Sequence, residues 1–407
     1  MPASETRGGR VVLSPAFKAE AHERYERLRA IGPIHAATFS SGLEGQLVVG
    51  YDLAREALTH PALLKDPTPA ADALSAIGYV VNKPGVGLGG HMLEADPPAH
   101  TRLRRLVSGA FTPRRTAALA LRIEAIAHAL VDAMPPAGEL DLVVAFTGPL
   151  PLTVMAELLG IPECLREDFR RMSAHALTVA APEHRDALAG LHRLLRGLLA
   201  DKRSDQGDGL LSDLIAARDE DDGRLSDDEL VGTALLLIVA GHETTVNLLG
   251  TALLALLRHP AQLRLLRDAP ESVPGAVEEF LRYDTSVELA THRYAAEDLE
   301  LGGVPIPRGT PVVVALASAG RDAPLPHAQD PAALDVTRPA ARHLAFGHGI
   351  HYCLGAPLAR LEAAVALRVL LARVPLVELA VPEEDLAWIP SGMMRGLLAL
   401  PVRYRRA

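Results

Sequence analysis

Hydrophobic residues recur every three to four positions along most of the chain, with polar residues between them. This spacing places apolar side chains on one face of a helix. It predicts helices over Phe17–Ile31, Ala99–Ala110, Arg114–Met134, Leu150–Leu159, Arg185–Asp201, Ser226–Arg258, Pro274–Tyr283 and Ala356–Val374. Strand-like segments are fewer and are expected at Gln46–Val49, Leu299–Leu301, Pro311–Ala315 and Leu397–Tyr404. The pattern therefore predicts a mainly α fold with small β-sheets.

The segment Ser226–Arg258 predicts the longest helix. Ser226, with Glu229 three residues later, is typical of a capping box, and Pro260 marks the far end. A helix of about 33 residues is about 50 Å long, which is enough to cross the whole domain. Because the residues from Val231 to Ala240 are apolar on nearly every side, we expect this helix to run through the core.

The middle of this helix then becomes polar, at Ala240-Gly241-His242-Glu243-Thr244-Thr245. Polar groups inside a buried helix are costly unless they have partners. The threonine hydroxyls can bond back to the carbonyl four residues earlier, which only bends the helix. Alternatively, Ala240 and Gly241 leave room for a flat cofactor, and Glu243 and Thr244 transfer protons.

Cys353 lies in a glycine-containing segment that a predicted helix follows directly. A thiolate at a helix N-terminus is stabilised by the helix dipole and by unpaired backbone N–H groups, so we expect it to ionise easily. Such a sulfur is a good axial ligand for haem iron. Two alternatives are an inert buried cysteine and a zinc site that includes His343, His348 and His351.

The run Phe346-Gly347-His348-Gly349-Ile350-His351-Tyr352-Cys353-Leu354-Gly355 resembles the haem-binding loop of the cytochrome P450 monooxygenases. The likeness extends over nearly the whole chain. The segments His91–Arg105 and Ala345–Glu362 are most similar to actinobacterial members that tailor macrolides and other polyketides. The resemblance implies the cytochrome P450 fold as a single domain over 1–407. Haem b would lie between the long central helix and the Cys353 loop with its following helix.

The resemblance also implies roles for individual residues. Cys353 corresponds to the iron ligand, and Glu243 and Thr244 correspond to the acid–threonine pair that delivers protons to oxygen. The family binds the haem propionates with residues that match His100, Arg104, Arg293 and His351. Further residues expected around the cofactor are Ala240, Gly241, Phe346, Gly347 and Gly355.

Glu279 and Arg282 match the Glu-x-x-Arg of the family, which braces the haem loop. The family usually adds a second arginine from a Pro-x-Arg-Phe segment, and here the matching stretch is Pro331-Ala332-Ala333-Leu334. Since Ala333 cannot complete a buried ion network, we expect different packing around this loop.

The activity that the resemblance implies is insertion of one oxygen atom from O2 into a bulky apolar small molecule, as a hydroxylation or an epoxidation. A macrolide or polyketide secondary metabolite is the expected substrate, and Glu94 and Glu288 are candidates for pairing with an amino sugar. Alternatives are oxidative coupling and hydroxylation of a steroid or fatty acid. A non-catalytic haem-binding protein is a remote alternative.

The net charge of −9 provides no overall basic surface for nucleic acid. Two cysteines in 407 residues are no disulfide framework, which favours a reducing cytoplasm. The N-terminus has no apolar signal segment, and the longest strongly apolar stretch, Ala234–Ala240, is too short to cross a membrane. We therefore expect a cytoplasmic, monomeric enzyme that binds neither nucleic acid nor membrane.

A group of arginines lies on and after one predicted helix despite the acidic total: Arg102, Arg104, Arg105, Arg114 and Arg115. A solvated basic face is the ordinary interpretation. By the family resemblance this face, joined by Arg360, receives an acidic ferredoxin, which a ferredoxin reductase supplies with electrons. Electron delivery would then depend on salt concentration.

Overall fold

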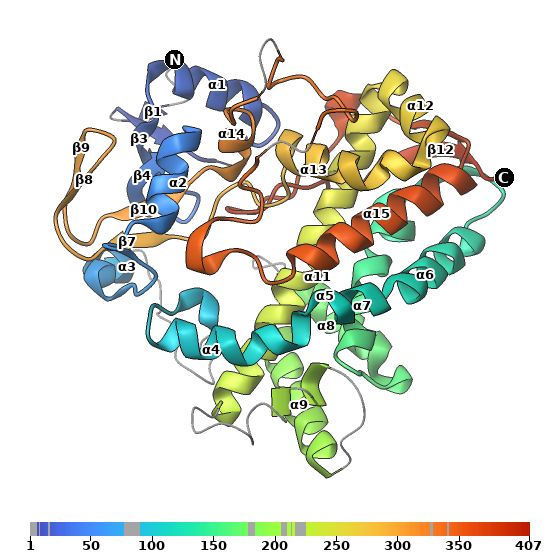
Figure 1. Cartoon of the computed structure of the whole chain (residues 1–407), viewed down its shortest axis with the longest axis horizontal. Coiled ribbons are helices and arrows are strands. Elements are labelled where there is room, and N and C mark those ends of the chain that lie inside the picture. The colour runs from blue at the N-terminus through green and yellow to red at the C-terminus, as the bar shows by residue number, and fades with distance from the viewer. Residues whose placement is uncertain are drawn as a thin grey trace.

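The computed structural model of the chain describes residues 6–7, 9–14, 17–76, 90–177, 184–204, 210–212, 214–215, 225–325, 329–339 and 342–407. Helices predominate among these residues and the strands are short, as predicted (Figure 1). The helices are α1 (Ala21–Ile31), α2 (Tyr51–Thr59), α3 (Ala71–Ala76), α4 (Ala99–Ser108), α5 (Pro113–Ala118), α6 (Ala120–Ala133), α7 (Pro149–Leu158), α8 (Arg166–Leu177), α9 (His184–Ser204), α11 (Asp227–Arg258), α12 (Pro260–Asp268), α13 (Val273–Tyr283), α14 (Leu316–Gly320) and α15 (Ala356–Arg373).

α11 is the long helix that the sequence predicts. The Ser226 hydroxyl accepts a hydrogen bond from the Glu229 N–H at 3.1 Å, and the Glu229 carboxylate accepts one from the Ser226 N–H at 2.8 Å. The predicted capping box is therefore confirmed, and α11 ends at Arg258, shortly before Pro260, as predicted. α11 has 32 residues and runs through the middle of the molecule (Figure 1).

By length and composition alone, α11 could cross a membrane. However, 61% of its most apolar 18-residue window is buried inside the protein. This burial is typical of a helix that forms the core of a globular protein.

The predicted helix Arg114–Met134 is in fact two helices, α5 and α6. The Thr112 side chain accepts a hydrogen bond from the Arg115 N–H, so it caps the start of α5. At the junction, the Leu119 N–H bonds to the Thr116 carbonyl three residues back, at 3.0 Å. Such a bond tightens the helix locally, and α6 begins at the next residue.

The largest sheet has the strand order β1-β2-β3-β4-β10-β7-β5. β3 and β4 form an antiparallel hairpin, β10 runs parallel to β4, and β7 pairs antiparallel with both β10 and β5. The sheet thus joins strands from both ends of the chain: β1 (Thr6–Arg7), β2 (Arg10–Val12), β3 (Ile34–Thr38), β4 (Glu44–Val48), β5 (Leu63–Leu64), β7 (Arg293–Ala295) and β10 (Pro311–Val314).

Two smaller sheets complete the described strands. One has the order β11-β12-β6, from β11 (Leu376–Leu379), β12 (Pro401–Arg405) and β6 (Ala137–Asp141), and the other is the hairpin of β8 (Leu299–Leu301) and β9 (Val304–Ile306). The C-terminal strand predicted over Leu397–Tyr404 begins only at Pro401, because Leu397 forms an isolated bridge with Trp388 instead.

The hydrophobic core divides along α11. Its first half, Leu230–Ile238, packs in a cluster with α4, α7, α8 and α9. Its second half, Leu248–Leu256, packs in a cluster with α6, α13 and α15. The strand-rich part with α1 and α2 has clusters of its own and lies beside these helices (Figure 1). The polar middle of α11 therefore lies between two separately packed regions.

Candidate functional site

The middle of α11 has an open face. Ala240 is exposed, and Glu243 and Thr244 are half-buried, although the residues before and after them on the same helix are mostly buried. The small and polar residues predicted to meet a cofactor are therefore on an accessible part of the core helix.

Gly241 has a different surrounding from the one expected. A Cβ added to Gly241 would collide with the Cε atom of Met155 in α7. The side that a side chain would occupy faces α7, so its absence lets the two helices pack closely, and the place of Gly241 beside a cofactor stays a prediction. Ala240, which is exposed, keeps the expected position.

Both interpretations of the polar patch find support in the geometry. The Thr244 hydroxyl donates to the Ala240 carbonyl at 2.8 Å, which is the bond back to the preceding turn. Burial raises the pKa of Glu243 to about 7. Its carboxyl is therefore protonated below neutral pH and ionised above it, so near pH 7 it can both give and take a proton.

The Cys353 loop is a compact turn that is closed by a hydrogen bond between two of its own residues. The Cys353 N–H donates to the Phe346 carbonyl at 2.9 Å. Gly347 and Gly349 have φ angles of +74° and +75°, which favour glycine, and a Cβ at Gly349 would lie 2.8 Å from Thr59. The loop thus needs these two glycines to turn back toward α15.

Cys353 is exposed, and Gly355 lies directly against its sulfur. The backbone N–H groups of Gly355 and Ala356, together with Arg104 and Arg360, favour the thiolate, as the sequence predicts for a helix start. The enclosing protein nevertheless raises the pKa of Cys353 by desolvation, and this effect is the largest. The expectation of easy ionisation is therefore corrected. The N–H groups at the helix start offset only part of the rise in the Cys353 pKa that burial causes.

Glu278 of α13 links that helix to both sides of the Cys353 loop, through His343 before the loop and Arg360 in α15 after it. Arg360 donates to this carboxylate with two N–H groups, at 2.6 and 2.9 Å, and the His343 ring lies 3.1 Å from it. Although burial raises the pKa of Glu278, these hydrogen bonds lower it to about 2. The Arg360 guanidinium also lies 4.5 Å from the centre of the Phe346 ring. The sequence marks Arg360 as part of a basic group, but nothing in it marks Glu278 as the partner of Arg360.

His100 and His351 are brought together from α4 and from the Cys353 loop. Their ring centres are 4.3 Å apart. In the described part of the chain, the buried Nε2 atoms of both rings have no hydrogen-bond partner. Burial, followed by the charges of neighbouring cations, lowers the pKa of His351 to about 3. Two partnerless imidazoles that point into a basic surrounding suit an anionic ligand.

Arg104 and Arg293 belong to the same basic surrounding. The Arg104 guanidinium donates to the Tyr352 carbonyl at 2.6 Å, and the buried Arg293 donates to the Leu58 carbonyl at 3.3 Å. Burial lowers the pKa of Arg293 to about 10, and Asp96 partly opposes this. All four predicted propionate residues thus lie in one region. This donor set fits the two carboxylates of haem, and the open face of α11 and exposed Cys353 fit its ring and iron.

Arg338 supplies the second arginine that Ala333 lacks. Arg282 donates to the Glu279 carboxylate at 2.7 and 2.8 Å, and Arg338 donates to it at 3.3 Å. Both arginines also donate to the Ala333 carbonyl, at 3.0 and 3.2 Å. The expectation that Ala333 leaves this network incomplete is therefore corrected: Ala333 contributes its backbone carbonyl, and Arg338, five residues later, contributes the charge.

Glu288 is not available to a substrate. Its carboxylate accepts hydrogen bonds from Lys18 at 2.6 Å and from the Tyr25 hydroxyl at 2.7 Å, and its side chain is 2% exposed. The candidate pairing of Glu288 with an amino sugar is therefore wrong. Glu94 is exposed.

The zinc alternative gains no support. Among the residues that the structure describes, no three His, Cys, Asp or Glu side chains are grouped as metal ligands. His343 bonds to Glu278, whereas the His351 ring lies beside that of His100 at a tilt of 54°, so the two histidines have different partners.

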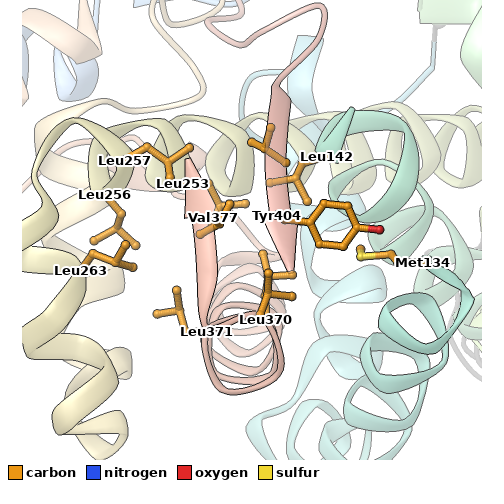
Figure 2. A pocket seen from close by; sticks show the side chains of 12 residues that line it. Met134, Leu142, Leu253, Leu256, Leu257, Leu263, Leu370, Leu371, Val377 and Tyr404 are labelled. Atoms are coloured by element: carbon orange, nitrogen blue, oxygen red, sulfur yellow. The ribbon is translucent and has the colours of Figure 1, made fainter. Parts of the chain in front are cut away.

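An enclosed cavity lies at the C-terminal end of α11, beside Leu253, Leu256 and Leu257. Figure 2 shows aliphatic side chains of α11, α15 and the neighbouring strands pointing toward one another around it. Its volume is about 10 Å³ and it has no polar lining beyond the Tyr404 side chain. A space of this size holds at most one water molecule, so it is a packing gap and no ligand site.

Comparison with known proteins agrees with this geometry. The family model described as Cytochrome P450 matches residues 168–385. Cytochrome P450 monooxygenase PikC of Streptomyces venezuelae is 46% identical over 401 residues, which cover 97% of this chain and 93% of that protein. Mycinamicin IV hydroxylase/epoxidase of Micromonospora griseorubida is 40% identical over 386 residues, which cover 93% and 94% of the two chains.

Among solved structures, CxnD is described as the cytochrome P450 enzyme for C–S bond formation in chuangxinmycin biosynthesis. It superposes with a TM-score of 0.87 at 40% identity and covers 98% of both chains. Similarity of this extent, in sequence and in structure, is shared by members of one enzyme family. The chain belongs to the cytochrome P450 family, whose members are monooxygenases that hold haem by a cysteine thiolate.

Proposed function

We propose that this cytochrome P450 hydroxylates or epoxidises a bulky apolar secondary metabolite, a macrolide or another polyketide, with haem held by Cys353. The observation that carries the proposal is a convergence of separate segments. The His351 ring of the Cys353 loop is 4.3 Å from the ring of His100, and Leu354 of the same loop packs against the cluster formed by the first half of α11, which leads to Ala240. These three segments would provide the contacts that the iron, the ring and the propionates of haem require.

Bound haem supplies the oxygen chemistry, in which one atom of O2 enters the substrate and the other leaves as water. In our proposal Cys353 donates electron density to the iron as a thiolate. Its proton leaves when the metal binds, because a metal ligand must be deprotonated. The N–H groups of Gly355 and Ala356 then stabilise the negative sulfur.

His100, Arg104, Arg293 and His351 would hold the propionates. The Nε2 atoms of the two histidines have no partner among the described residues, and Arg104 donates to the carbonyl of Tyr352, the residue after His351. Charge-assisted hydrogen bonds to carboxylates would satisfy these atoms. Ala240 of α11, with Phe346 and Gly347 of the Cys353 loop, would contact the ring.

Glu243 and Thr244 would deliver the protons that release water. A carboxyl with a pKa of about 7 can donate a proton and be reprotonated from solvent near neutral pH. The Thr244 hydroxyl, held on the Ala240 carbonyl at 2.8 Å, has its oxygen free to accept a hydrogen bond while its own hydrogen is engaged. This arrangement keeps a hydrogen-bond acceptor in a constant position on the open face of α11.

The substrate class is tested by titrating the ferric holoenzyme with a macrolide aglycone, testosterone and myristic acid. We expect the macrolide to cause the low-spin to high-spin absorption change with at least about tenfold lower Kd than the others, because a pocket that fits the larger apolar surface gains more on burial. A spin change with only testosterone or myristic acid would overturn the polyketide assignment and leave the haem assignment intact.

Replacing Thr244 with valine is expected to uncouple O2 use from product formation. Valine keeps the volume and removes the hydroxyl, so the ratio of product to O2 consumed should fall roughly tenfold or more, with the balance released as hydrogen peroxide. The measurement is product and peroxide per NADPH with the macrolide found by titration. Thr233→Val, on the same helix but with a buried side chain outside the open face, is the matched control and should leave the ratio unchanged. Unchanged coupling in Thr244→Val would remove Thr244 from proton delivery.

Oxidative bond formation is the second candidate. It is favoured by the similarity to CxnD, whose description names C–S bond formation. The same arrangement of Cys353, Glu243 and Thr244 serves both reactions, so the product decides between them: an added oxygen atom, or the loss of two hydrogen atoms with a new bond. Mass spectrometry of the product formed under ¹⁸O2 distinguishes the two.

We also propose that electrons come from an acidic ferredoxin, itself reduced by a ferredoxin reductase. A P450 needs a redox partner, and the side of α4 and α5 beside α15 is basic. Arg105, Arg114 and Arg115 are exposed there. Three more arginines belong to this basic group and also have partners within the protein: Arg102 with Glu229, Arg104 with the Tyr352 carbonyl and Arg360 with Glu278.

The remaining features that we propose are a single domain over 1–407, a monomer, and a cytoplasmic location without nucleic-acid or membrane binding. The alignment with PikC covers 97% of the chain, which supports one domain. Both cysteines are free, which suits a reducing compartment, and the net charge of −9 disfavours nucleic acid.

A further inference from the structure

Lys65 is a buried lysine next to the propionate region that the sequence analysis did not single out. Its side chain is 5% exposed. Its ammonium donates to the carbonyl oxygens of Thr291 and His292, both at 3.0 Å, and contacts the Thr291 hydroxyl. These three oxygens belong to the residues directly before Arg293. Among the residues that the structure describes, the printed partners of this ammonium are neutral oxygens and no carboxylate contacts it. A buried charge in such a position is costly, so we expect it to have another role.

The strand register brings Lys65 opposite Arg293. In the antiparallel pair of β5 and β7, Leu63 faces Ala295 and Leu64 faces Tyr294. Continuing this register by one position sets Lys65 against Arg293. Residues directly opposite in such a pair lie on the same face of the sheet, and like charges there repel. The folded structure therefore keeps Lys65 and Arg293 close together although their positive charges repel each other.

The nearest acid does not neutralise this pair by a direct contact. The Asp96 carboxylate accepts hydrogen bonds from the backbone N–H groups of Lys65 and Asp66, at 2.8 to 3.0 Å. The Asp96 carbonyl accepts from the His100 N–H at 2.9 Å, at the start of α4. Asp96 thus ties the Lys65 backbone to the helix that carries His100 and Arg104, while the lysine ammonium stays on neutral oxygens.

The charges around Lys65 come from several elements. Burial, followed by Arg293 on β7, lowers the pKa of Lys65, while Asp96 and Glu94 oppose this. The Lys65 ammonium lies 3.0 Å from the carbonyl oxygens of Thr291 and His292, so this cation is next to Arg293, which is proposed to hold a propionate. Two carboxylates brought into this group would relieve the repulsion.

We propose that Lys65 is a positioning residue of the haem site, whose buried charge strengthens binding of the two propionates and favours the reduced iron. It acts by its charge and not as a direct ligand, because its three N–H groups already have acceptors. The inference rests on the proposed haem site at Cys353 and adds a residue to it.

The test measures the rate at which haem leaves the holoenzyme for an excess of apomyoglobin. Lys65→Met should release haem faster by on the order of tenfold, the size expected for one unit charge acting through protein of effective dielectric constant about 20. Lys65→Arg keeps the charge and should stay near the wild-type rate. The ferric–ferrous midpoint potential of Lys65→Met should move to a more negative value, since a positive charge that disfavoured the ferric state is gone.

A second cofactor distinguishes the effect of the Lys65 charge on the propionates from the effect of its hydrogen bonds on the local structure. When the proteins are reconstituted with haem dimethyl ester, the propionate charges are absent, so the rate ratio of Lys65→Met to wild type should approach one. A ratio that is the same for both cofactors would mean that Lys65 only braces Thr291 and His292, and would overturn the proposal. Equal rates and potentials with ordinary haem would overturn it as well.

Two further measurements keep these outcomes distinct. If Lys65→Met does not fold, Lys65→Gln provides N–H donors to the two carbonyls without the charge, and the same differences are expected. The wild-type protein must first show the red-shifted absorption of a thiolate–haem complex with CO after reduction. Its absence would contradict the proposed site at Cys353, whereas its presence with no effect of Lys65 would contradict only the role of Lys65.

Discussion

Replacing Cys353 with serine is expected to abolish the red-shifted absorption band of the reduced, CO-treated protein and to reduce monooxygenase turnover below detection. A hydroxyl does not ionise near neutral pH and is a poor ligand for haem iron, so the electron donation that favours O–O cleavage is lost. The loss of activity should exceed the roughly 10–100-fold that removal of a residue behind a metal ligand costs. The measurements are the CO difference spectrum and product formation with a ferredoxin system.

Cys164→Ser is the matched control for this change. Cys164 is the only other cysteine in the sequence, it lies in a short turn after Pro162, and it is exposed. Its replacement should leave both the spectrum and turnover unchanged. If Cys353→Ser retained the shifted band while Cys164→Ser lost it, the iron ligand would be Cys164 and the assignment to Cys353 would be wrong. Retention of the band in both single variants would exclude a cysteine ligand at either position.

The features that depend on neighbouring residues in the chain could be predicted from the sequence. The start of α11 follows from the side chains of Ser226 and Glu229, which cap each other within one turn. The turn of the Cys353 loop follows from Gly347 and Gly349, whose positive φ angles few other residues adopt. In both cases the residues that determine the structure lie within a few positions of it.

The strands were harder to predict, since most are two to five residues long. β5 and β7 show no alternation that a pattern could detect, yet their register sets Lys65 against Arg293. A lysine in a loop gives no sign in the sequence that it will be buried beside a binding site. Its burial depends on β7, which lies more than 200 residues later in the chain.

The other differences from the sequence-based predictions arise from charged and buried groups that are far apart in the sequence but close in the structure. The sequence places no arginine at Ala333, and only the three-dimensional path of the chain shows that Arg338 reaches Glu279. Likewise, the engagement of Glu288 by Lys18 joins residues 270 positions apart. The reduced ionisation of Cys353 has the same origin, because desolvation depends on all the protein around the sulfur and not on the helix start alone.

Replacing Glu279 with alanine is expected to lower the free energy of unfolding by about 3–5 kcal/mol, because two buried arginines would lose their carboxylate. Glu279, Arg282 and Arg338 are 3%, 0% and 5% exposed, so water cannot compensate. The measurement is equilibrium unfolding in urea, followed by circular dichroism. Glu139→Ala is the control: Glu139 also pairs with an arginine, Arg403, but both side chains are largely exposed, so no measurable change is expected.

The assignment of Arg338 to this network has its own test in the same assay. Arg338→Ala should destabilise the protein more than Glu139→Ala, because Gln329 and the carbonyls of Asp330 and Ala333 would lose a buried donor. Adding Ala333→Arg should not restore stability, since Ala333 is exposed and only its carbonyl faces the network. Recovery by Ala333→Arg would mean that the loop can adopt the usual family packing. Full stability of Arg338→Ala alone would mean that Arg282 satisfies Glu279 without a second cation.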